Sequence, residues 1–330
     1  MKEREVMTIS IIQHYIANFN GKPVVVDNYY GYQLGDQYYF IVQTEQVEVI
    51  HLEHNWCADF LIEKGYQQVA KVIQNQQEQW ITTENDKHYI VLQVNNNSQM
   101  KLSHGEQLAH FHQTGALYPY TPNYIATYGQ WQSLWEEKLA GIEAYYQQQL
   151  EVRPASRYLR LFIDTFPYII GLTENAIQYV QEANQERRFD LPDQACVTFQ
   201  RYRNQLEQYF IFSDQFFYDH PSRDLAEYIR PFLLHNNEKM RQSVRSFLDD
   251  YEKVQPLSVF SWRLLFARLL CPIHLFDFID QAKNQVDSEE AYFRYKDLLE
   301  KQVNYEAGLK SFFHMVGIDP NQNEIPFLDW

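Results

Sequence analysis

A change of hydrophobic period near residue 95 divides this sequence into two parts that predict different structures. Before it, short runs of β-branched and aromatic residues alternate with turn residues. After it, apolar residues recur at helical spacing. Between the two parts, residues 95–98 read Asn-Asn-Asn-Ser, which is the composition of a linker. We therefore expect a β-rich N-terminal lobe at 1–94, a hinge at 95–99 and a helical C-terminal lobe at 100–330.

The first part predicts a small sheet with one helix inserted between its early and late strands. The helix is expected at 47–64, where apolar residues recur mostly three and four apart and Gly65 follows. Glycines 31 and 35 are taken as turn residues. The expected strands lie at 22–26, 38–42, 69–73, 79–82 and 88–94.

The second part predicts a mainly helical body interrupted by two short strand-like pieces, at 195–199 and 209–212. The expected helices lie at 105–114, 131–150, 157–185, 223–236, 239–251, 261–282 and 289–315. The fold class is therefore α+β: a small sheet lobe with one helix, followed by a large helical lobe. This is the plan of the protein-kinase-like fold, in which ATP would bind at the hinge, near residues 93–97.

Charge and cysteine usage narrow the possible partners. The formal net charge is −15, so a nucleic-acid backbone or an anionic membrane surface would be repelled. No apolar run approaches the length of about 20 residues that a membrane helix needs, and the charged N-terminus does not predict a signal peptide. The three cysteines are far apart and odd in number, which is typical of a reducing compartment and offers no metal-site spacing.

A motif near residue 220 resembles the aminoglycoside and choline phosphotransferase branch of the kinase-like fold. In that branch a Gly-x-Pro-x-x-Asp-Leu-Ala stretch follows the metal-binding aspartate. Here Pro221, Asp224, Leu225 and Ala226 match it, and Asp219 stands in the Gly position. Residues 105–112 also match the branch's Gly-x-x-Leu-Ala-x-Phe-His helix.

Two further runs, 166–179 and 261–270, resemble the YutH-type spore-coat proteins of endospore-forming bacteria. That group is related to the CotS-type coat proteins and is commonly labelled as kinases. The resemblance covers nearly the whole chain and is weakest in the first 40 residues.

The resemblance also predicts that the catalytic base is missing. The branch's loop reads His-Gly-Asp-x-His-x-x-Asn, and its Asp activates the acceptor hydroxyl while its Asn holds magnesium. If Thr198 takes the first His position, the base position reads Gln200 and the Asn position reads Gln205. Other frames put Arg201 or Tyr202 at the base position, and Asn204 aligns with the Asn only if Phe199 replaces the Asp. No frame supplies a carboxylate, and glutamine cannot take a proton at neutral pH.

The positions for metal ligands and for the phosphate-binding lysine also lack the residues that a kinase needs. An ungapped count back from Pro221 places Phe212 at the second magnesium-ligand position, and Asp214 is the only weak candidate nearby. The third strand reads Phe-Ile-Val-Gln at 40–43, so the position of the lysine that a kinase needs there reads Gln43. Glu53 and Glu63, on the following helix, are then expected to be surface charges. We expect no catalytic, cofactor-binding or metal-binding residue.

Other polar residues have simpler structural interpretations. Asp224 is predicted to be a helix cap or a buried acceptor, and Asp219-His220 a helix entry rather than an acid–base pair. His220, Pro221 and Asp224 are thus taken as structural residues of the motif. His110 and His112 are expected to point to different sides of their helix. His51 and His54, one turn apart, are expected on a solvated face.

The resulting hypothesis is a pseudokinase with a structural or assembly role in the spore coat. It would be made in the mother-cell cytoplasm, contact other coat proteins and need no cofactor. The alternative is an active ATP-dependent small-molecule phosphotransferase of the aminoglycoside, choline or homoserine kinase type. That enzyme would use ATP and magnesium and recruit Asp214 or Asp219 for the metal. A third class is a nucleotide- or metabolite-binding module without turnover.

Overall fold

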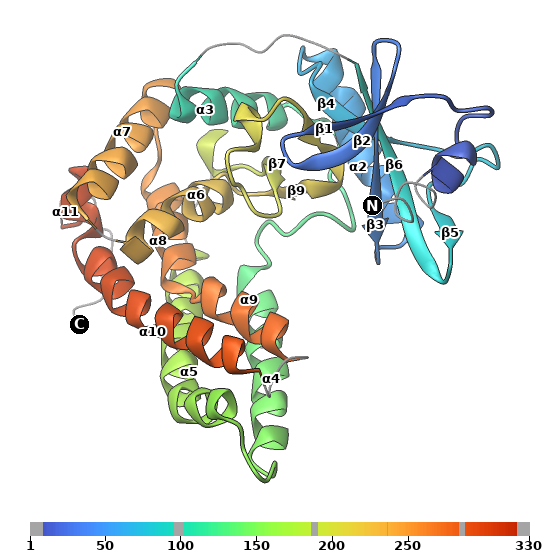
Figure 1. Ribbon diagram of the computed structural model, residues 1–330. Coiled ribbons are helices and arrows are strands. Elements are labelled where there is room, and N and C mark those ends of the chain that lie inside the picture. The colour runs from blue at the N-terminus through green and yellow to red at the C-terminus, as the bar shows by residue number, and fades with distance from the viewer. Residues whose placement is uncertain (1–8, 96–101, 186–190, 236, 284–287, 322–330) are drawn as a thin grey trace. The chain divides into compact units, whose positions relative to one another are not determined.

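The computed structural model describes residues 9–95, 102–185, 191–235, 237–283 and 288–321 (Figure 1). By contacts the chain divides into two units. The sheet unit comprises residues 1–127 and 195–219, and the helical unit comprises residues 128–194 and 220–330. Most of the predicted hinge, residues 96–99, lies outside the described residues. Helix α3 and the segment 195–219 group with the sheet by contacts, whereas the sequence assigned both to the C-terminal lobe.

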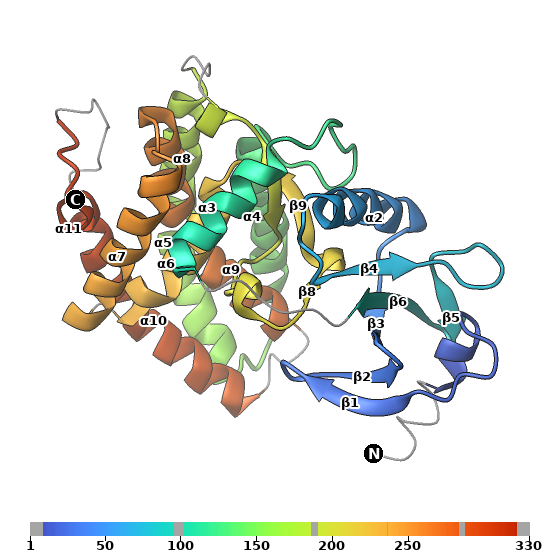
Figure 2. The ribbon, with the colours of Figure 1, turned by 90° about the horizontal axis from the view of Figure 1, so that it is seen from above.

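The sheet unit is built on a mixed sheet with strand order β1-β2-β3-β6-β4-β8, in which β5 pairs with β6. Only β4 and β8 pair in parallel among the described strands of this sheet. Helix α2 packs against β4 (Figures 1 and 2). The elements up to the predicted hinge are β1 (Lys22–Val26), β2 (Tyr29–Leu34), β3 (Gln37–Thr44), α2 (Glu48–Glu63), β4 (Val69–Ile73), β5 (Thr82–Glu84) and β6 (Lys87–Asn95).

The strands are joined by tight turns whose residues tolerate left-handed backbone conformations. Asp27 and Asn28, between β1 and β2, have φ of 48° and 68°, as a two-residue hairpin loop requires. Asn85 and Asp86, between β5 and β6, repeat the arrangement with φ of 51° and 58°. Gly31, taken from the sequence as a turn residue, lies inside β2 instead. A Cβ there would come within 2.5 Å of the Tyr39 carbonyl oxygen on β3, so the close approach requires glycine.

The remaining elements of the sheet unit are α3 and a second, two-stranded sheet. Helix α3 begins with a capping box, in which Ser103 and Glu106 bond each other's backbone N–H. Strands β7 and β9 pair antiparallel, and α3 packs on β7 at Gly115. The elements are α3 (His104–Gly115), β7 (Cys196–Phe199), β8 (Ile211–Phe212) and β9 (Phe216–Asp219), with 3-10 turns η2 (Gln205–Glu207) and η3 (Ser213–Gln215).

The helical unit contains long amphipathic helices with buried apolar faces. Its elements are α4 (Trp131–Gln149), α5 (Arg157–Ala183), η1 (Leu191–Asp193), α6 (Ser222–His235), α7 (Glu238–Val254), α8 (Val259–Leu270), α9 (Ile273–Ala282), α10 (Glu289–Lys310) and α11 (Phe312–Val316). Helix α5 packs against both α4 and α8, and α6 packs against α8 and α10.

The predicted single helix at 261–282 is wrong, because the chain breaks at Pro272 into α8 and α9. Proline lacks the N–H that a continuous helix needs. By length and composition the segment 259–282 could cross a membrane, with a mean hydropathy of 1.4, which corrects the expectation that no run would approach that length. However, 83% of its apolar window is buried inside the protein, as in a core helix.

Candidate functional site

The face of the sheet where a kinase would hold its nucleotide is covered by aromatic side chains. In the kinase plan that face carries the third-strand lysine. Here β3 presents Tyr38, Phe40 and Val42 to it, and Phe210 and Phe212 pack directly on them. We call Tyr29, Tyr38, Phe40, Phe210 and Phe212 the inner aromatic cluster. Its ring centroids are 4.3 Å apart for Tyr29–Phe212, 4.9 Å for Tyr38–Phe210 and 5.0 Å for Phe40–Phe212.

Backbone pairing holds this segment on the sheet. Strand β8 extends the sheet beyond β4, with Ile211 paired to Val69 and Phe212 to Ala70. The Tyr209 N–H donates to the carboxylate of Asp27 in the β1–β2 turn, at 2.5 Å. In the kinase plan this turn is the phosphate loop, which needs several glycines to approach a ligand closely. Here it is a two-residue turn, and it is bonded to the segment across from it.

The loop that would hold the catalytic groups is held by hydrogen bonds between its own residues. Gln200, at the predicted base position, is an exposed residue directly after β7. Gln205, at the predicted Asn position, is buried. Its side-chain amide accepts from Arg203 N–H at 2.5 Å and donates to the Arg201 carbonyl at 2.7 Å. It also donates to the Gln215 side chain at 3.0 Å. Gln205 therefore holds the loop together, and its amide oxygen is already occupied.

The metal-ligand positions do not converge on a cation site. Phe212 is 2% exposed within the inner aromatic cluster and offers no donor atom. Asp214 lies in η3, half-buried, and burial raises the pKa of its carboxyl to about 6. Its Oδ1 is enclosed and has no hydrogen-bond partner. No group of three acidic, histidine or cysteine residues is arranged as metal ligands within the described parts of the chain.

Helix α2, which would carry the glutamate partner of the lysine, has an unusual buried face. Gln43 is exposed on the opposite face of β3 from the cluster, so Val42 rather than Gln43 faces the inner side. Glu53 is 3% exposed, which corrects the expectation of a surface charge; Glu63 is exposed as expected. The Glu53 carboxylate accepts from the backbone N–H groups of Asn123, Tyr124 and Ile125 at 2.7–3.0 Å. It therefore anchors the segment after α3.

The histidines of α2 are also buried, not solvated as expected. The ring centroids of His51 and His54 are 5.9 Å apart, and burial lowers their pKa values to about 4 and about 3. His51 Nε2 bonds the Thr44 hydroxyl, and His54 Nε2 bonds the Phe216 carbonyl, each at 3.1 Å. Both Nδ1 atoms are enclosed without a partner. On α3, His112 is buried and His110 is exposed, so these two point apart as predicted.

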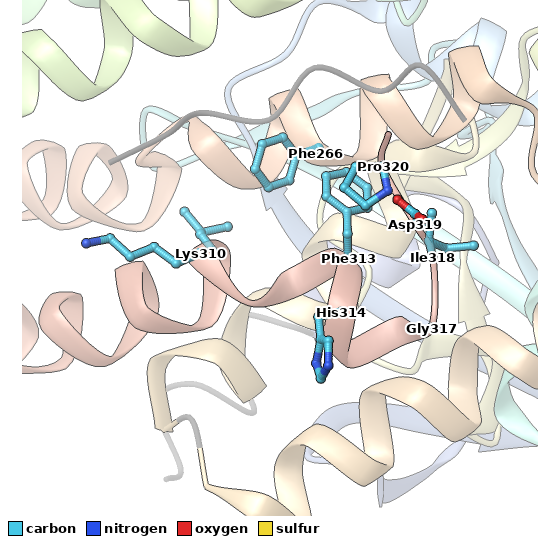
Figure 3. A pocket seen from close by; sticks show the side chains of 9 residues that line it. Phe266, Lys310, Phe313, His314, Gly317, Ile318, Asp319 and Pro320 are labelled. Carbon is cyan, nitrogen blue, oxygen red and sulfur yellow. The ribbon is translucent and has the colours of Figure 1, made fainter. Parts of the chain in front are cut away.

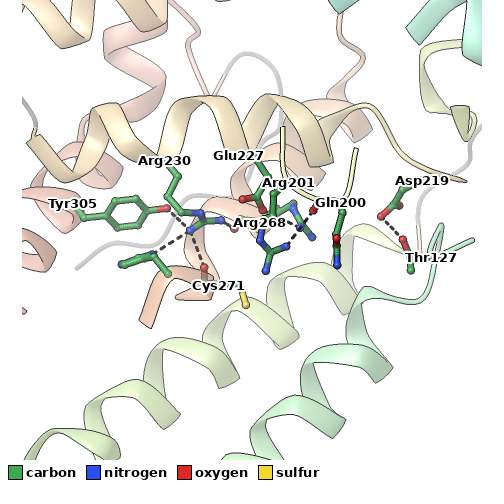
Figure 4. Close-up of polar contacts among 10 residues, drawn as sticks. Thr127, Gln200, Arg201, Asp219, Glu227, Arg230, Arg268, Cys271 and Tyr305 are labelled. Carbon is green, nitrogen blue, oxygen red and sulfur yellow. Dashed lines mark hydrogen bonds and ion pairs between the residues drawn. The ribbon is translucent and has the colours of Figure 1, made fainter. Parts of the chain in front are cut away.

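The motif residues near 220 lie inside the protein at the start of α6. His220, Pro221 and Asp224 are all buried, and Asp224 lies in the first turn of the helix. His220 Nδ1 accepts from the Ser222 N–H at 3.1 Å, which satisfies one of the first N–H groups of α6. Asp219 ends β9, where Thr127 donates to its carboxylate at 2.6 Å (Figure 4). The predicted structural roles stay predictions, but these positions suit them.

The helical unit contains a buried polar cluster that the sequence did not indicate. Arg230 donates to the carbonyls of Arg268 and Cys271 at 2.7 and 3.0 Å, and to Tyr305 Oη at 2.8 Å (Figure 4). The break at Pro272 leaves the last carbonyls of α8 without helical partners. Arg230 thus caps α8 from a neighbouring helix. Arg268 pairs with Glu227 at 2.9 Å in the interior, so both charges are compensated.

A cavity of about 560 Å³ in the helical unit offers no convergent site either. It is lined by Phe266, Phe313 and residues of the chain just after α11. Its two basic side chains, Lys310 and His314, point in different directions (Figure 3). A ligand pocket normally aims a few polar groups at one point.

The residues present do not fit a magnesium–nucleotide complex. The face expected to hold it is packed with aromatic rings. The lysine position reads Gln43, which is exposed on the opposite face of β3, and the amide at the Asn position is bonded within its own loop. We therefore assign no catalytic step to this arrangement.

Comparison with known proteins identifies the family. The family model described as "Spore coat putative kinase YutH" matches residues 10–312. The endospore coat-associated protein YutH of Bacillus subtilis (strain 168) is 30% identical over 309 residues, which cover 92% of this chain and 91% of that protein.

Solved structures share the fold at low identity. An aminoglycoside phosphotransferase from Alicyclobacillus acidocaldarius subsp. acidocaldarius DSM 446 has a TM-score of 0.62 at 11% identity, covering 93% of this chain and 95% of that chain. A microcompartment-associated aminopropanol kinase has a TM-score of 0.58 at 11% identity, covering 96% and 99%. These matches confirm the predicted fold class and the predicted resemblance. The chain belongs to the YutH family of kinase-like spore-coat proteins.

Proposed function

We propose that this protein is a pseudokinase that serves as a structural component in assembly of the spore coat. The observation that carries the proposal is the packing of Phe210 and Phe212 on the inner face of the sheet. A nucleotide between the sheet and this segment would have to displace both rings. Fully burying an aromatic side chain contributes about 1.5–3 kcal/mol relative to exposing it, so displacement would cost several kcal/mol before any ligand contact formed.

The polar residues around this face support the same conclusion. Gln205 takes the place where a kinase would use an asparagine on its metal, and Glu53 lies on the helix where a kinase would use a glutamate to pair with its lysine. Each side chain is instead bonded to the protein backbone, by three N–H donors at Glu53 and by Arg201 and Arg203 at Gln205. If a ligand displaced the Glu53 or Gln205 side chain from these bonds, buried backbone N–H groups would be left unpaired. Each unpaired donor costs about 1–3 kcal/mol.

The proposal is tested by thermal denaturation of the full chain with ATP, with and without magnesium. We expect no magnesium-dependent stabilisation at millimolar ATP. A ligand at about a hundredfold excess over its dissociation constant would stabilise the fold by about 2.7 kcal/mol. Magnesium alone and ADP serve as controls for unspecific effects. A clear shift that needs both ATP and magnesium would contradict the pseudokinase assignment and favour the active phosphotransferase.

The third class gives a different outcome in the same experiment. A shift with nucleotide that does not depend on magnesium, and without phosphate release, would identify a binding module. The partly enclosed Asp214 is the one observation that favours the active alternative, since its unpartnered oxygen could accept a cation. Because the described residues hold no group of three ligand side chains, Asp214 does not outweigh the packed face.

The coat role is tested by imaging. The family is endospore coat-associated by its described relatives. We propose synthesis in the mother-cell cytoplasm followed by incorporation into the coat through contacts with other coat proteins. A fluorescent protein fused after Trp330 is expected to form a ring around the forespore in sporulating cells. Diffuse signal with no enrichment at the spore would contradict the structural role.

A further inference from the structure

The cavity of about 560 Å³ in the helical unit is lined by residues of α8, α10, α11 and the chain that follows α11 (Figure 3). Three of these residues are apolar and almost fully buried: Phe266, Leu309 and Phe313 are 1%, 3% and 5% exposed. The rings of Phe266 and Phe313 lie 4.9 Å apart, measured between centroids. The volume is within the range of about 300–1,000 Å³ that binding cavities have. An apolar lining of this kind favours an apolar occupant.

The end of α11 fixes the path of the chain along this cavity. Gly317 has a φ of 77°, the left-handed conformation in which glycine ends many helices. Its N–H donates to the His314 carbonyl at 3.2 Å, and the Ile318 N–H donates to the Phe313 carbonyl at 2.9 Å. This pair of bonds is the Schellman motif. Ile318 and Pro320 then line the cavity, so the chain beyond them begins at its edge.

The next residues have the composition of an apolar ligand. Residues 322–330, which we call the distal segment, lie outside the described residues and read Gln-Asn-Glu-Ile-Pro-Phe-Leu-Asp-Trp. Segments that remain in water are usually poor in apolar residues. Moving one Phe or Leu side chain from water into an apolar site favours the buried state by roughly 10- to 100-fold. The apolar residues of the distal segment are Ile325, Pro326, Phe327, Leu328 and Trp330.

The charged groups at the cavity also suit the distal segment. Lys310 and His314 are exposed, and neither has a hydrogen-bond or ion-pair partner among the described residues. The carboxylate of Asp319, which also lines the cavity, already accepts from the Asn321 N–H at 3.0 Å. The distal segment carries two carboxylates, at 324 and 329, and no Lys or Arg. Its carboxylates can therefore accept from the two basic side chains.

The connection favours the chain's own segment over any other occupant. Residues 325–328 follow Asn321 by four to seven residues. An extended chain covers at most about 3.3–3.6 Å a residue, so this stretch can reach across the cavity. A segment tethered beside its site has an effective concentration of about millimolar. A second copy at micromolar concentration would compete poorly with it.

We propose that the distal segment docks in this cavity of its own chain. Its apolar side chains, with Phe327 as the main anchor, pack on Phe266 and Phe313, and its carboxylates bond Lys310 and His314. The docked segment covers the apolar lining and closes the cavity to other chains. This proposal does not rest on the pseudokinase assignment, because it uses residues of the helical unit alone.

Thiol labelling of the full chain tests the proposal. The three native cysteines are buried, so Ile325→Cys and Leu328→Cys each add a reactive thiol. The matched control is Val303→Cys on α10, at a side chain that is 69% exposed. Maleimide labelling at 325, at 328 or at both should be at least about tenfold slower than at the control, because an apolar side chain there is buried. Adding Phe327→Ser should restore the control rate. Labelling at both positions as fast as at the control would overturn the proposal.

Disulfide trapping identifies which chain supplies the segment. Mild oxidation of a chain with His314→Cys and Leu328→Cys should form a disulfide within that chain. Val303→Cys with Leu328→Cys is the control, because Val303 lies only about 10 Å from Lys310 along α10 and an undocked segment would reach both positions. The control should give a clearly lower yield. Equal yields, or a disulfide that forms only between two chains, would overturn the proposal.

Discussion

The substitution Asp214→Asn is expected to stabilise the fold at neutral pH. Burial raises the folded-state pKa of this carboxyl from 3.8 to about 6. Between these values the folded state binds more protons than the unfolded state, so stability falls as pH rises through about 6. At about 1.36 kcal/mol for each pH unit, the full cost of the charge above pH 7 is about 3 kcal/mol. The side chain is half-buried, so screening by solvent lowers this to about 1–3 kcal/mol.

Urea denaturation at about pH 4.5 and about pH 7.5 measures the effect. Asp214→Asn should exceed the natural chain in unfolding free energy at the higher pH, and at the lower pH its advantage should fall to about a third of that value. Asp36→Asn, at an exposed turn, is the matched control and should change stability by less than about 0.5 kcal/mol at both. Equal effects of Asp214→Asn at both pH values would refute the reasoning. A loss of magnesium-dependent ATP stabilisation would show instead that Asp214 is a metal ligand.

Four further predictions concern stability. Phe212→Ala should cost about 3–5 kcal/mol in urea denaturation, while Ala at the 58%-exposed Phe293 should cost far less. Glu53→Gln should lower stability by about 1–3 kcal/mol and raise amide exchange at 123–125, which an exposed glutamate would not do. Asp224→Ala should cost about 1–3 kcal/mol as a cap or buried acceptor; an unchanged melting temperature would contradict this. His51 and His54 have lowered folded-state pKa values, so stability should decline as pH falls from about 6.5 toward 4, and His54→Gln should flatten that decline.

The sequence predicted those helices and strands whose conformation depends on residues within the same segment. The run at 22–26 forms β1, and the helix expected at 47–64 is α2 at 48–63. The Leu-Ala-x-Phe-His stretch lies on α3 with its two histidines on different sides, because a two-residue step on a helix is about 200°. In each case the backbone conformation follows from residues close in sequence.

Long-range packing explains where the predictions failed. Gly31 suggested a turn, but it sits inside β2 because the Tyr39 carbonyl of the next strand approaches too closely for a Cβ. The apolar spacing at 47–64 predicted the helix but not which polar residues it buries: Glu53 and His54 are buried, whereas Trp56 is exposed. Their burial depends on partners about 70 and 160 residues away, namely the 123–125 amides and the Phe216 carbonyl. The break between α8 and α9, by contrast, could have been predicted from Pro272, because proline interrupts a helix.

The positions that match the kinase branch and those that depart from it differ in what surrounds them. His220, Pro221 and Asp224 are buried at the start of α6, where we propose that they support the fold whether or not a ligand binds. The departures, Gln43, Gln205 and Phe212, stand at sequence positions where a kinase side chain would contact nucleotide or metal. A polar side chain that faces a ligand site has no hydrogen-bond partner when no ligand is bound. Burying such an unpaired group lowers the stability of the fold. An aromatic ring there instead buries apolar area against Tyr29 and Phe40. Replacing a polar ligand-binding side chain with an aromatic ring therefore stabilises the sheet unit and removes a ligand contact. If the inner face is a packed core in this way, substitutions that create a cavity at Phe212 should lower stability without creating affinity for ATP.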